Sequence, residues 1–263
     1  MLTIGKHMGN KIKQLLNCWP PNGVRTVSAL KKCGYSQDLL NRYRYSGWLK
    51  SLGEGALMRP HDEPNLLGAI YAVQNDLKLN VHIGGRSALE LRGRAHYARL
   101  GKQNVWIFGE VRKLPAWFLH YPWEETLHFV SDKFEETHLH EGLVNLDFGN
   151  LSVLVSGDVR AMIELLTLVP KSLSLDEAKD LMGGLTSPNP KEILGLLKSC
   201  KSVKAKRLFM LLAEVNGHQW AEMIDQSEID FGKGVRQIVP GGKLNKKYQL
   251  VVPESLFQFE GAE

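Results

Sequence analysis

The residue types best suited to recognising another molecule gather in one short segment, from Gln37 to Tyr45. At 100° per residue, a helix over this segment has an apolar side that comprises Leu39, Leu40 and Tyr43. The opposite side carries Gln37, Asn41 and Tyr45, flanked by Asp38, Arg42 and Arg44. Because Asn and Gln pair bidentately with adenine and Arg with guanine, this is the composition of a helix that enters the major groove of DNA.

Two kinds of DNA contact are expected from these residues. Gln37 and Asn41 lie in the first turns of the helix, where base contacts usually fall. The cations in and around the helix are expected to contact phosphates: Lys31, Lys32, Arg42, Arg44, Lys50 and Arg59. Two other interpretations fit the same residues: a small helical bundle whose polar side is only solvated, and a winged helix that contacts protein.

The segments before this helix would support it. Apolar residues from Met8 to Trp19 follow a helical pattern, which the run Pro20-Pro21-Asn22-Gly23 ends. A second helix is predicted from Val27 to Cys33, with Thr26 as its N-cap, and Gly34 ends it. Ser36 would then cap the polar helix, predicted from Gln37 to Ser46.

A β-hairpin is predicted directly after the polar helix. Its strands would run from Trp48 to Leu52 and from Ala56 to Arg59, around the turn Gly53-Glu54-Gly55. Three helices followed by a hairpin are the order of a winged helix-turn-helix, with Lys50 and Arg59 on the wing.

The rest of the chain has a mixed pattern. Helices are expected over 66–77 and from Arg86, and strands over 81–85, 104–111, 127–134 and 142–157. Residues 159–223 are mainly helical, interrupted by the run GGLTSPNP, and a basic hairpin-like piece follows at 235–253. The predicted fold class is α+β, with a winged helix-turn-helix over residues 1–62 and a larger mixed α/β domain over residues 63–263.

Charge is distributed unevenly along the chain. The formal net charge of +5 divides into +8 over residues 1–60, −5 over 61–190 and +2 over 191–263. A basic first domain before an acidic middle favours binding to an anionic polymer, with a separate effector domain. A solvated basic surface without a partner is the plainer alternative.

A soluble, cytoplasmic protein is expected. No apolar run approaches the roughly 18 residues that span a bilayer, so no membrane association is predicted. Cys18, Cys33 and Cys200 are odd in number and unmatched in spacing, which predicts neither a disulfide framework nor a zinc knuckle.

Two short motifs raise other chemistry without supporting it. The run HIGGRSALEL (82–91) could place a phosphate at a helix N-terminus, but it lacks the spacing of a nucleotide loop and favours a tight strand-to-helix turn. The run HLHE (138–141) would put two histidines on one face of a strand, which is too few ligands for zinc. No catalytic motif, metal site or cofactor is predicted.

The C-terminal third of the chain could form a second basic surface. Five basic residues lie between Lys198 and Arg207, of which Lys198, Lys201 and Lys204 recur at three-residue intervals. With the C-terminal cations they could bind nucleic acid; the set comprises Lys201, Lys204, Arg207, Lys233, Arg236, Lys243, Lys246 and Lys247. A solvated helix face fits these residues equally well.

Three segments resemble the AbiEi-type antitoxins of type IV toxin–antitoxin systems. They read GWLKSLGEGALMR (47–59), GAIYAVQ (68–74) and VHIGGRSALEL (81–91), and the C-terminal run GKGVRQIVPGGKLNKKYQLVVP (232–253) is similar to the closing hairpin of that family. Leu57-Met58 departs from the family pattern, which often has an aromatic residue after the alanine.

The resemblance implies an autoregulatory antitoxin without enzymatic activity. Its N-terminal winged helix would bind inverted repeats in its own promoter and repress transcription. Its larger domain would counter a nucleotidyltransferase toxin, generally without a stable complex. Two alternatives are a ligand-responsive one-component regulator and an enzyme that acts on nucleic acid through Asp147 or Asp158. The sequence contains no motif that supports the enzyme.

Overall fold

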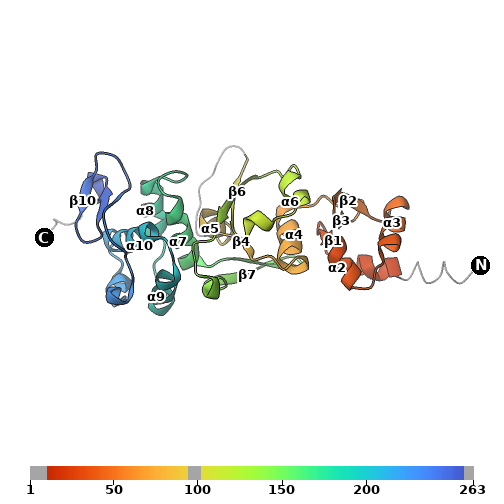
Figure 1. Ribbon diagram of the computed structural model, residues 1–263, viewed down its shortest axis with the longest axis horizontal. Helices are drawn as coiled ribbons and strands as arrows, with labels where there is room; N and C mark the ends of the chain where they lie inside the picture. The colour runs from red at the N-terminus through yellow and green to blue at the C-terminus, as the bar shows by residue number, and fades with distance from the viewer. Residues whose placement is uncertain (1–10, 94–101, 258–263) are drawn as a thin grey trace, which may run out of the picture. The chain divides into compact units, whose positions relative to one another are not determined.

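The computed structural model describes residues 11–93 and 102–257 (Figure 1). The chain divides into two compact units. The first comprises Met1–His82, Gly101–Ser131 and Asn145–Leu154, and the second comprises Ile83–Leu100, Asp132–Val144 and Val155–Glu263. The predicted α+β class is confirmed.

The N-terminal helices lie where local sequence signals place them. Residues 11–17 are helical, and Met8 lies outside the described residues. α2 (Val27–Lys32) begins after Thr26, whose hydroxyl accepts the backbone N–H of Ala29 at 3.2 Å. α3 (Gln37–Tyr45) begins after Ser36, whose hydroxyl accepts the N–H of Leu39 at 3.3 Å. Both predicted N-caps are therefore confirmed.

A three-stranded antiparallel sheet completes this module, in the order β1-β3-β2. The predicted hairpin is confirmed as β2 (Lys50–Gly53) and β3 (Ala56–Met58). Gly55 in its turn has a φ of 84°, a conformation that favours glycine. β1 (Arg25–Thr26) was not predicted, because two residues are too few to show a strand pattern. The arrangement is consistent with a winged helix-turn-helix.

An apolar cluster of its own holds α3 against its neighbours. It comprises Ile12, Leu15, Trp19, Leu30, Leu39, Leu40, Tyr43, Leu49 and Leu57. The indole N–H of Trp19 donates to the carbonyl of Gly23 at 2.9 Å, so the turn between the first two helices is fixed by this core as well. The packing uses one side of α3 and leaves the other side to solvent.

The helix after the hairpin supports β1. α4 (Leu66–Tyr71) continues into a π-helical turn (Ala72–Asp76), which confirms the helix predicted over 66–77. The Asp76 carboxylate accepts the N–H of Thr26 at 2.7 Å and the Nε–H of Arg25 at 3.1 Å. Residues beyond 62 thus stabilise the N-terminal sheet, and the domain boundary at residue 62 stays a prediction.

The larger sheet has five strands in the order β6-β5-β4-β8-β7. They are β4 (Val81–Ile83), β5 (Asn104–Gly109), β6 (Thr126–Ser131), β7 (Leu143–Phe148) and β8 (Leu151–Ser156). β5 pairs with β6, and β4 with β8, in parallel. The side-chain amide of Gln74 adds hydrogen bonds to the backbone of Val81 and of Leu154, at 2.8–3.0 Å.

Short helical segments connect these strands. They are α5 (Gly85–Leu91), α6 (Ala116–His120) and 3-10 turns at Val111–Lys113 and Glu136–His138. The strand expected for His138 and His140 is wrong, because the second turn and its continuation occupy these positions.

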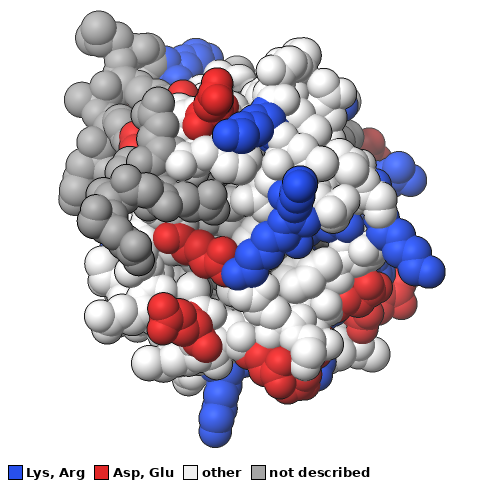
Figure 2. All heavy atoms as spheres, turned by 90° about the vertical axis from the view of Figure 1, so that its left-hand side faces the viewer, with Lys and Arg blue, Asp and Glu red and all other residues white. Residues whose placement is uncertain are grey.

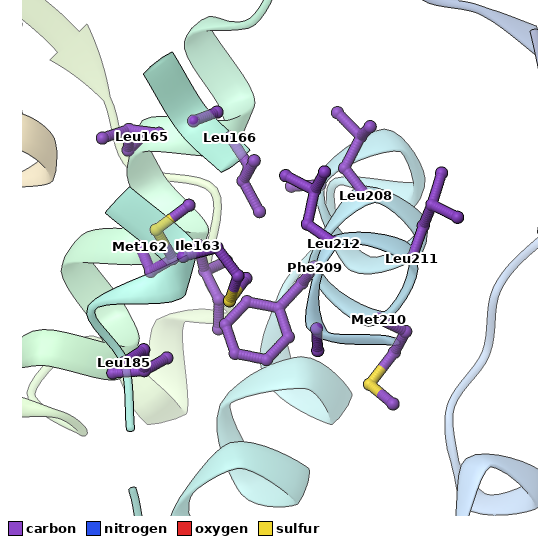
Figure 3. Close-up of a cluster of buried hydrophobic side chains, with 14 of the residues drawn as sticks. Met162, Ile163, Leu165, Leu166, Leu185, Leu208, Phe209, Met210, Leu211 and Leu212 are labelled. Atoms are coloured by element: carbon purple, nitrogen blue, oxygen red, sulfur yellow. The ribbon is translucent and has the colours of Figure 1, made fainter. Parts of the chain in front are cut away.

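The second unit is built around α10 (Val203–Val215). α7 (Asp158–Leu168), α8 (Leu175–Gly183) and α9 (Pro190–Ser199) share its apolar core. Figure 3 shows Phe209 and Leu212 of α10 beside Met162 and Ile163 of α7. Every residue from Ala205 to Ala213 is buried, so α10 is enclosed on all sides, including positions that carry charge.

Three short strands follow α10, in the order β10-β11-β9. β10 (Lys243–Asn245) and β11 (Leu250–Val252) form the predicted hairpin. β9 (Arg236–Gln237) lies on the other side of β11 and is parallel to it. Further 3-10 turns lie at Gln219–Met223, Gln226–Glu228 and Glu254–Phe257.

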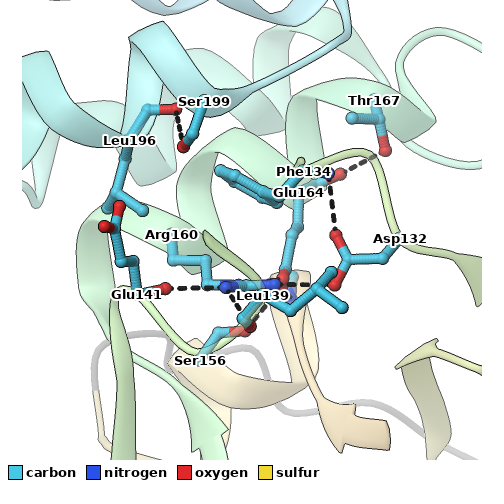
Figure 4. Close-up of polar contacts among 11 residues, drawn as sticks. Asp132, Phe134, Leu139, Glu141, Ser156, Arg160, Glu164, Thr167, Leu196 and Ser199 are labelled. Carbon is cyan, nitrogen blue, oxygen red and sulfur yellow. Dashed lines mark hydrogen bonds and ion pairs between the residues drawn. The ribbon is translucent and has the colours of Figure 1, made fainter. Parts of the chain in front are cut away.

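A fully buried arginine organises the polar interior of this unit (Figure 4). Arg160 on α7 donates to the carboxylates of Asp132 at 2.7 Å and Glu164 at 2.9 Å. It also donates to the carbonyls of Leu139 at 2.7 Å and Glu141 at 2.6 Å. The HLHE segment is therefore held by its backbone, through a buried charge network.

Candidate nucleic-acid interface

α3 has the two sides that its sequence predicts. Leu39, Leu40 and Tyr43 are buried in the N-terminal core. The other positions predicted to contact DNA are exposed or, for Asn41, half-buried; they are Gln37, Asn41, Arg42, Arg44 and Tyr45. The apolar side thus anchors the helix, and its amides and guanidiniums lie on the surface.

The two amides predicted to contact bases lie next to each other. Nε2 of Gln37 donates to Oδ1 of Asn41 at 3.4 Å, across one helical turn. This long, exposed bond is weak, so both amides can exchange it for stronger bonds to a base edge. Because the two residues are four positions apart, their side chains lie on the same side of α3.

Four of the cations predicted to contact phosphates have unpaired side chains within the described residues. Lys31 and Lys32 lie in the last turn of α2, Arg44 lies on α3 and Lys50 begins β2. All four are exposed, and within the described residues none forms a side-chain hydrogen bond or ion pair. Such cations are suited to phosphate contacts, because no internal partner must be given up.

Arg59 differs from the other predicted phosphate contacts. Its guanidinium donates to both carboxylate oxygens of Asp62, at 2.8 and 3.1 Å, and to the carbonyl of Trp19 at 3.5 Å. Asp62 in turn accepts the N–H of Asn22 at 2.7 Å. Arg59 thus ties the end of the hairpin to the turn that follows the first helix, and its contact with phosphate stays a prediction.

Two aromatic residues at the end of α3 are unusually exposed. Tyr45 is 92% exposed and was predicted to contact DNA. Trp48 is 50% exposed and was not among the predicted contacts. The sequence could have indicated Trp48 as well, because this residue directly follows Gly47, where the helix is predicted to end. In the structure Gly47 has a φ of 77°. Both aromatics adjoin the cations of α3 and β2 in sequence.

The structure removes Arg207 from the second basic surface. Only 2% of this residue is exposed. Its guanidinium donates to four carbonyls at 2.6–3.2 Å, those of Phe231, Gly232, Gly234 and Gln249. The prediction is corrected because this arginine fastens the C-terminal segment to α10.

Lys204 also has an internal role. Its ammonium is half-buried and donates to the carbonyls of Thr167, at 2.9 Å, and Val169. These carbonyls lie at the C-terminal end of α7, so Lys204 caps that helix.

The other members of that set are exposed but mixed with acids. Lys201, Lys243 and Lys246 face solvent, whereas Lys247 pairs with Glu214 at 2.6 Å. Lys233 and Arg236 are exposed as well. Figure 2, which views the end of the second unit, shows basic side chains interspersed with acidic ones rather than a uniform basic patch.

The remaining motifs have structural explanations. The N–H of Gly85 donates to Glu164 at 3.0 Å and Arg86 pairs with Glu90 at 2.6 Å, so carboxylates of the fold occupy the HIGG turn. Within residues 11–93 and 102–257, no group of three or more His, Cys, Asp or Glu side chains is placed to hold a metal ion.

Comparison with protein families gives two matches that together cover most of the chain. Residues 8–100 match the family described as "Transcriptional regulator, AbiEi antitoxin N-terminal domain". Residues 102–253 match "Transcriptional regulator, AbiEi antitoxin, Type IV TA system". The chain belongs to the AbiEi family. It is an AbiEi antitoxin and transcriptional regulator of a type IV toxin–antitoxin system, which confirms the resemblance found in the sequence.

A solved structure has the same fold. The crystal structure of the RV2827C protein from Mycobacterium tuberculosis superposes with a TM-score of 0.57, over 91% of this chain and 89% of that chain. At 16% identity, the likeness concerns the fold alone. Comparison with curated proteins finds no match.

The AbiEi family is one of regulators and antitoxins rather than known enzymes. In the part of the chain that the structure describes, no helix is both long and apolar enough to cross a membrane.

Proposed function

We propose that this AbiEi protein represses its own operon by binding inverted repeats in the promoter, with α3 in the major groove. The observation that supports this proposal is the solvent side of α3, which presents the amides of Gln37 and Asn41 together with the exposed guanidiniums of Arg42 and Arg44. In this proposal the two amides read bases, while Arg42, Arg44, Lys31, Lys32 and Lys50 hold phosphates. Tyr45 lies at the edge of the same surface.

The proposed function also includes action against a toxin. The chain counters a nucleotidyltransferase toxin encoded beside it, without a stable complex, and the larger domain over residues 63–263 carries this activity. Co-expression with that toxin should restore growth, and the two proteins should elute separately in size-exclusion chromatography. Failure to restore growth would remove the antitoxin half of the proposal.

DNA binding is tested with the fragment upstream of the gene, against random DNA of equal length. Gln37→Ala combined with Asn41→Ala should weaken binding to the specific fragment, by about 1–3 kcal/mol for each lost base contact. Binding to random DNA should change little, because phosphate contacts remain. Gln219→Ala, at an exposed amide of the second unit, is the matched control. Equal affinity of the unaltered protein for both fragments would contradict the proposal.

A ligand-responsive regulator is the second candidate. Its support is a pocket in the second unit that is large enough for a small molecule. A compound that raises the melting temperature and changes operator affinity would favour it.

A further inference from the structure

A pocket of about 310 Å³ opens where the run GGLTSPNP interrupts the C-terminal helices. This run separates α8 from α9 and contributes Thr186, Ser187 and Asn189 to the pocket wall. The N-terminal turn of α7 and the residue after α5 line the other side. The volume lies within the range of small-molecule sites.

Charge in the pocket is not balanced. Arg92 and Asp158 form an ion pair at 2.8 Å and neutralise each other. Glu192, in the first turn of α9, lines the same pocket and forms no ion pair or side-chain hydrogen bond within the described residues. Burial, and then the Asp158 carboxylate, raise the pKa of Glu192, while Arg92 opposes them. Among the described residues that line the pocket, Glu192 is thus a carboxylate without an ion-pair partner.

This arrangement selects against anionic ligands. Two helix N-termini face the pocket, those of α7 and α9, and such ends attract anions. Each already has a carboxylate in its own first turn, Asp158 in α7 and Glu192 in α9. A further anion would meet both carboxylates, whereas a cation would restore the charge balance at Glu192.

The pocket adjoins a small apolar recess. The recess measures about 20 Å³ and is walled by Leu89, Met162 and Leu181, with Asp158, Gly184 and Leu185 shared between the two cavities. Its volume is that of a single water or methyl group, and an apolar recess of this size favours the latter.

We propose that this pocket binds a small organic cation, with an ammonium or guanidinium head against Glu192 and a short aliphatic end in the apolar recess. The hydroxyls of Thr186 and Ser187 accept the remaining N–H groups of the head. The proposal does not depend on DNA binding by α3, and it names a ligand class that the function proposed above leaves open.

The test uses thermal unfolding of the full chain with n-butylammonium chloride at up to tens of millimolar and constant ionic strength. The melting temperature should rise and saturate with n-butylammonium, and should not do so with sodium butyrate or 1-butanol. The rise should disappear in Glu192→Gln and persist in Glu222→Gln, which removes an exposed carboxylate elsewhere in the unit. It should also shrink as pH falls through the pKa of Glu192, because the protonated acid no longer attracts a cation.

Three outcomes would overturn the proposal: a response to butyrate equal to that to butylammonium, an unchanged response in Glu192→Gln, or no saturable shift. Because Glu192 is only partly buried and Gln is of similar size, we expect Glu192→Gln to keep its fold, which the melting curve without probe verifies.

Discussion

Arg207 shows that a basic residue in a basic stretch of sequence can be wholly structural. Its neighbours in sequence include three lysines, which suggest a charged surface. In the fold the guanidinium is enclosed and saturated by carbonyls that lie 24–42 residues away. A planar group with five N–H donors is the one side chain that can bind so many acceptors at once.

Replacing this arginine should therefore affect stability. Arg207→Met leaves four buried carbonyls without their donor, and we expect the free energy of unfolding to fall by about 3 kcal/mol or more. Urea unfolding followed by circular dichroism measures the loss. Lys201→Met, at an exposed position of the same basic run, should change it by less than about 0.5 kcal/mol. Equal effects of the two substitutions would refute this role.

Glu192 gives the unliganded protein a predictable pH dependence. A carboxyl whose pKa is higher in the folded state binds more protons there than in the unfolded chain, so stability falls as pH rises through this range. Glu192→Gln removes this effect. The variant should match or exceed the unaltered protein in melting temperature at pH 7, and the difference should vanish below the ordinary pKa of 4.5. A lower melting temperature at pH 7 alone would show that Glu192 stabilises the fold.

Among the helices, α4 shows how closely the helix-turn-helix module packs against residues that follow it. Gly68 lies in α4 and has no positive φ, so backbone conformation does not require glycine at this position. Glycine is needed there because no space is available for a side chain. A Cβ there would lie 2.6 Å from the carbonyl oxygen of Asn22 and 3.2 Å from the Cα of Gly23, both backbone atoms.

Two helical glycines are therefore expected to respond in opposite directions to alanine. Gly68→Ala should lower the free energy of unfolding by about 1–3 kcal/mol, because the backbone must move apart. Gly195→Ala in α9 has no heavy atom within 4 Å of the new Cβ, and should raise it by about 0.5–1 kcal/mol. Chemical denaturation of both variants measures the contrast, and a stabilised Gly68→Ala would contradict the packing argument.

At the scale of the whole molecule, DNA binding through the proposed surface is expected to be mainly electrostatic. Five exposed cations of the N-terminal module are proposed to contact phosphates, namely Lys31, Lys32, Arg42, Arg44 and Lys50. If all five contact phosphates, the logarithm of the association constant should fall against the logarithm of salt concentration with a slope of about −4 to −5 per protomer.

Single substitutions show how much each cation contributes to that slope. Lys31→Ala should reduce its magnitude by about 0.9, with similar losses on specific and random DNA. Lys191→Ala, at an exposed lysine of α9, should leave the slope unchanged. Fluorescence anisotropy over 50–300 mM salt measures both, and an unchanged slope in Lys31→Ala would remove this residue from the interface.

Much of the N-terminal module was predictable because its signals are local. The caps Thr26 and Ser36 bond to residues three positions away, and the apolar side of α3 repeats with the helical period. The family matches confirm the antitoxin assignment that rested on segments 47–59, 68–74 and 81–91.

Other features depend on residues that are distant in sequence. β1 exists because Arg25 and Thr26 meet β3 and Asp76, and Arg59 is held by hydrogen bonds to Asp62 and to the carbonyl of Trp19. The pocket brings Arg92, Asp158 and Glu192 together from three separate helical regions. Composition and periodicity report which residues are charged and which faces are apolar. Whether a charge faces solvent or a buried carbonyl follows from long-range packing, which has no local signature in the chain.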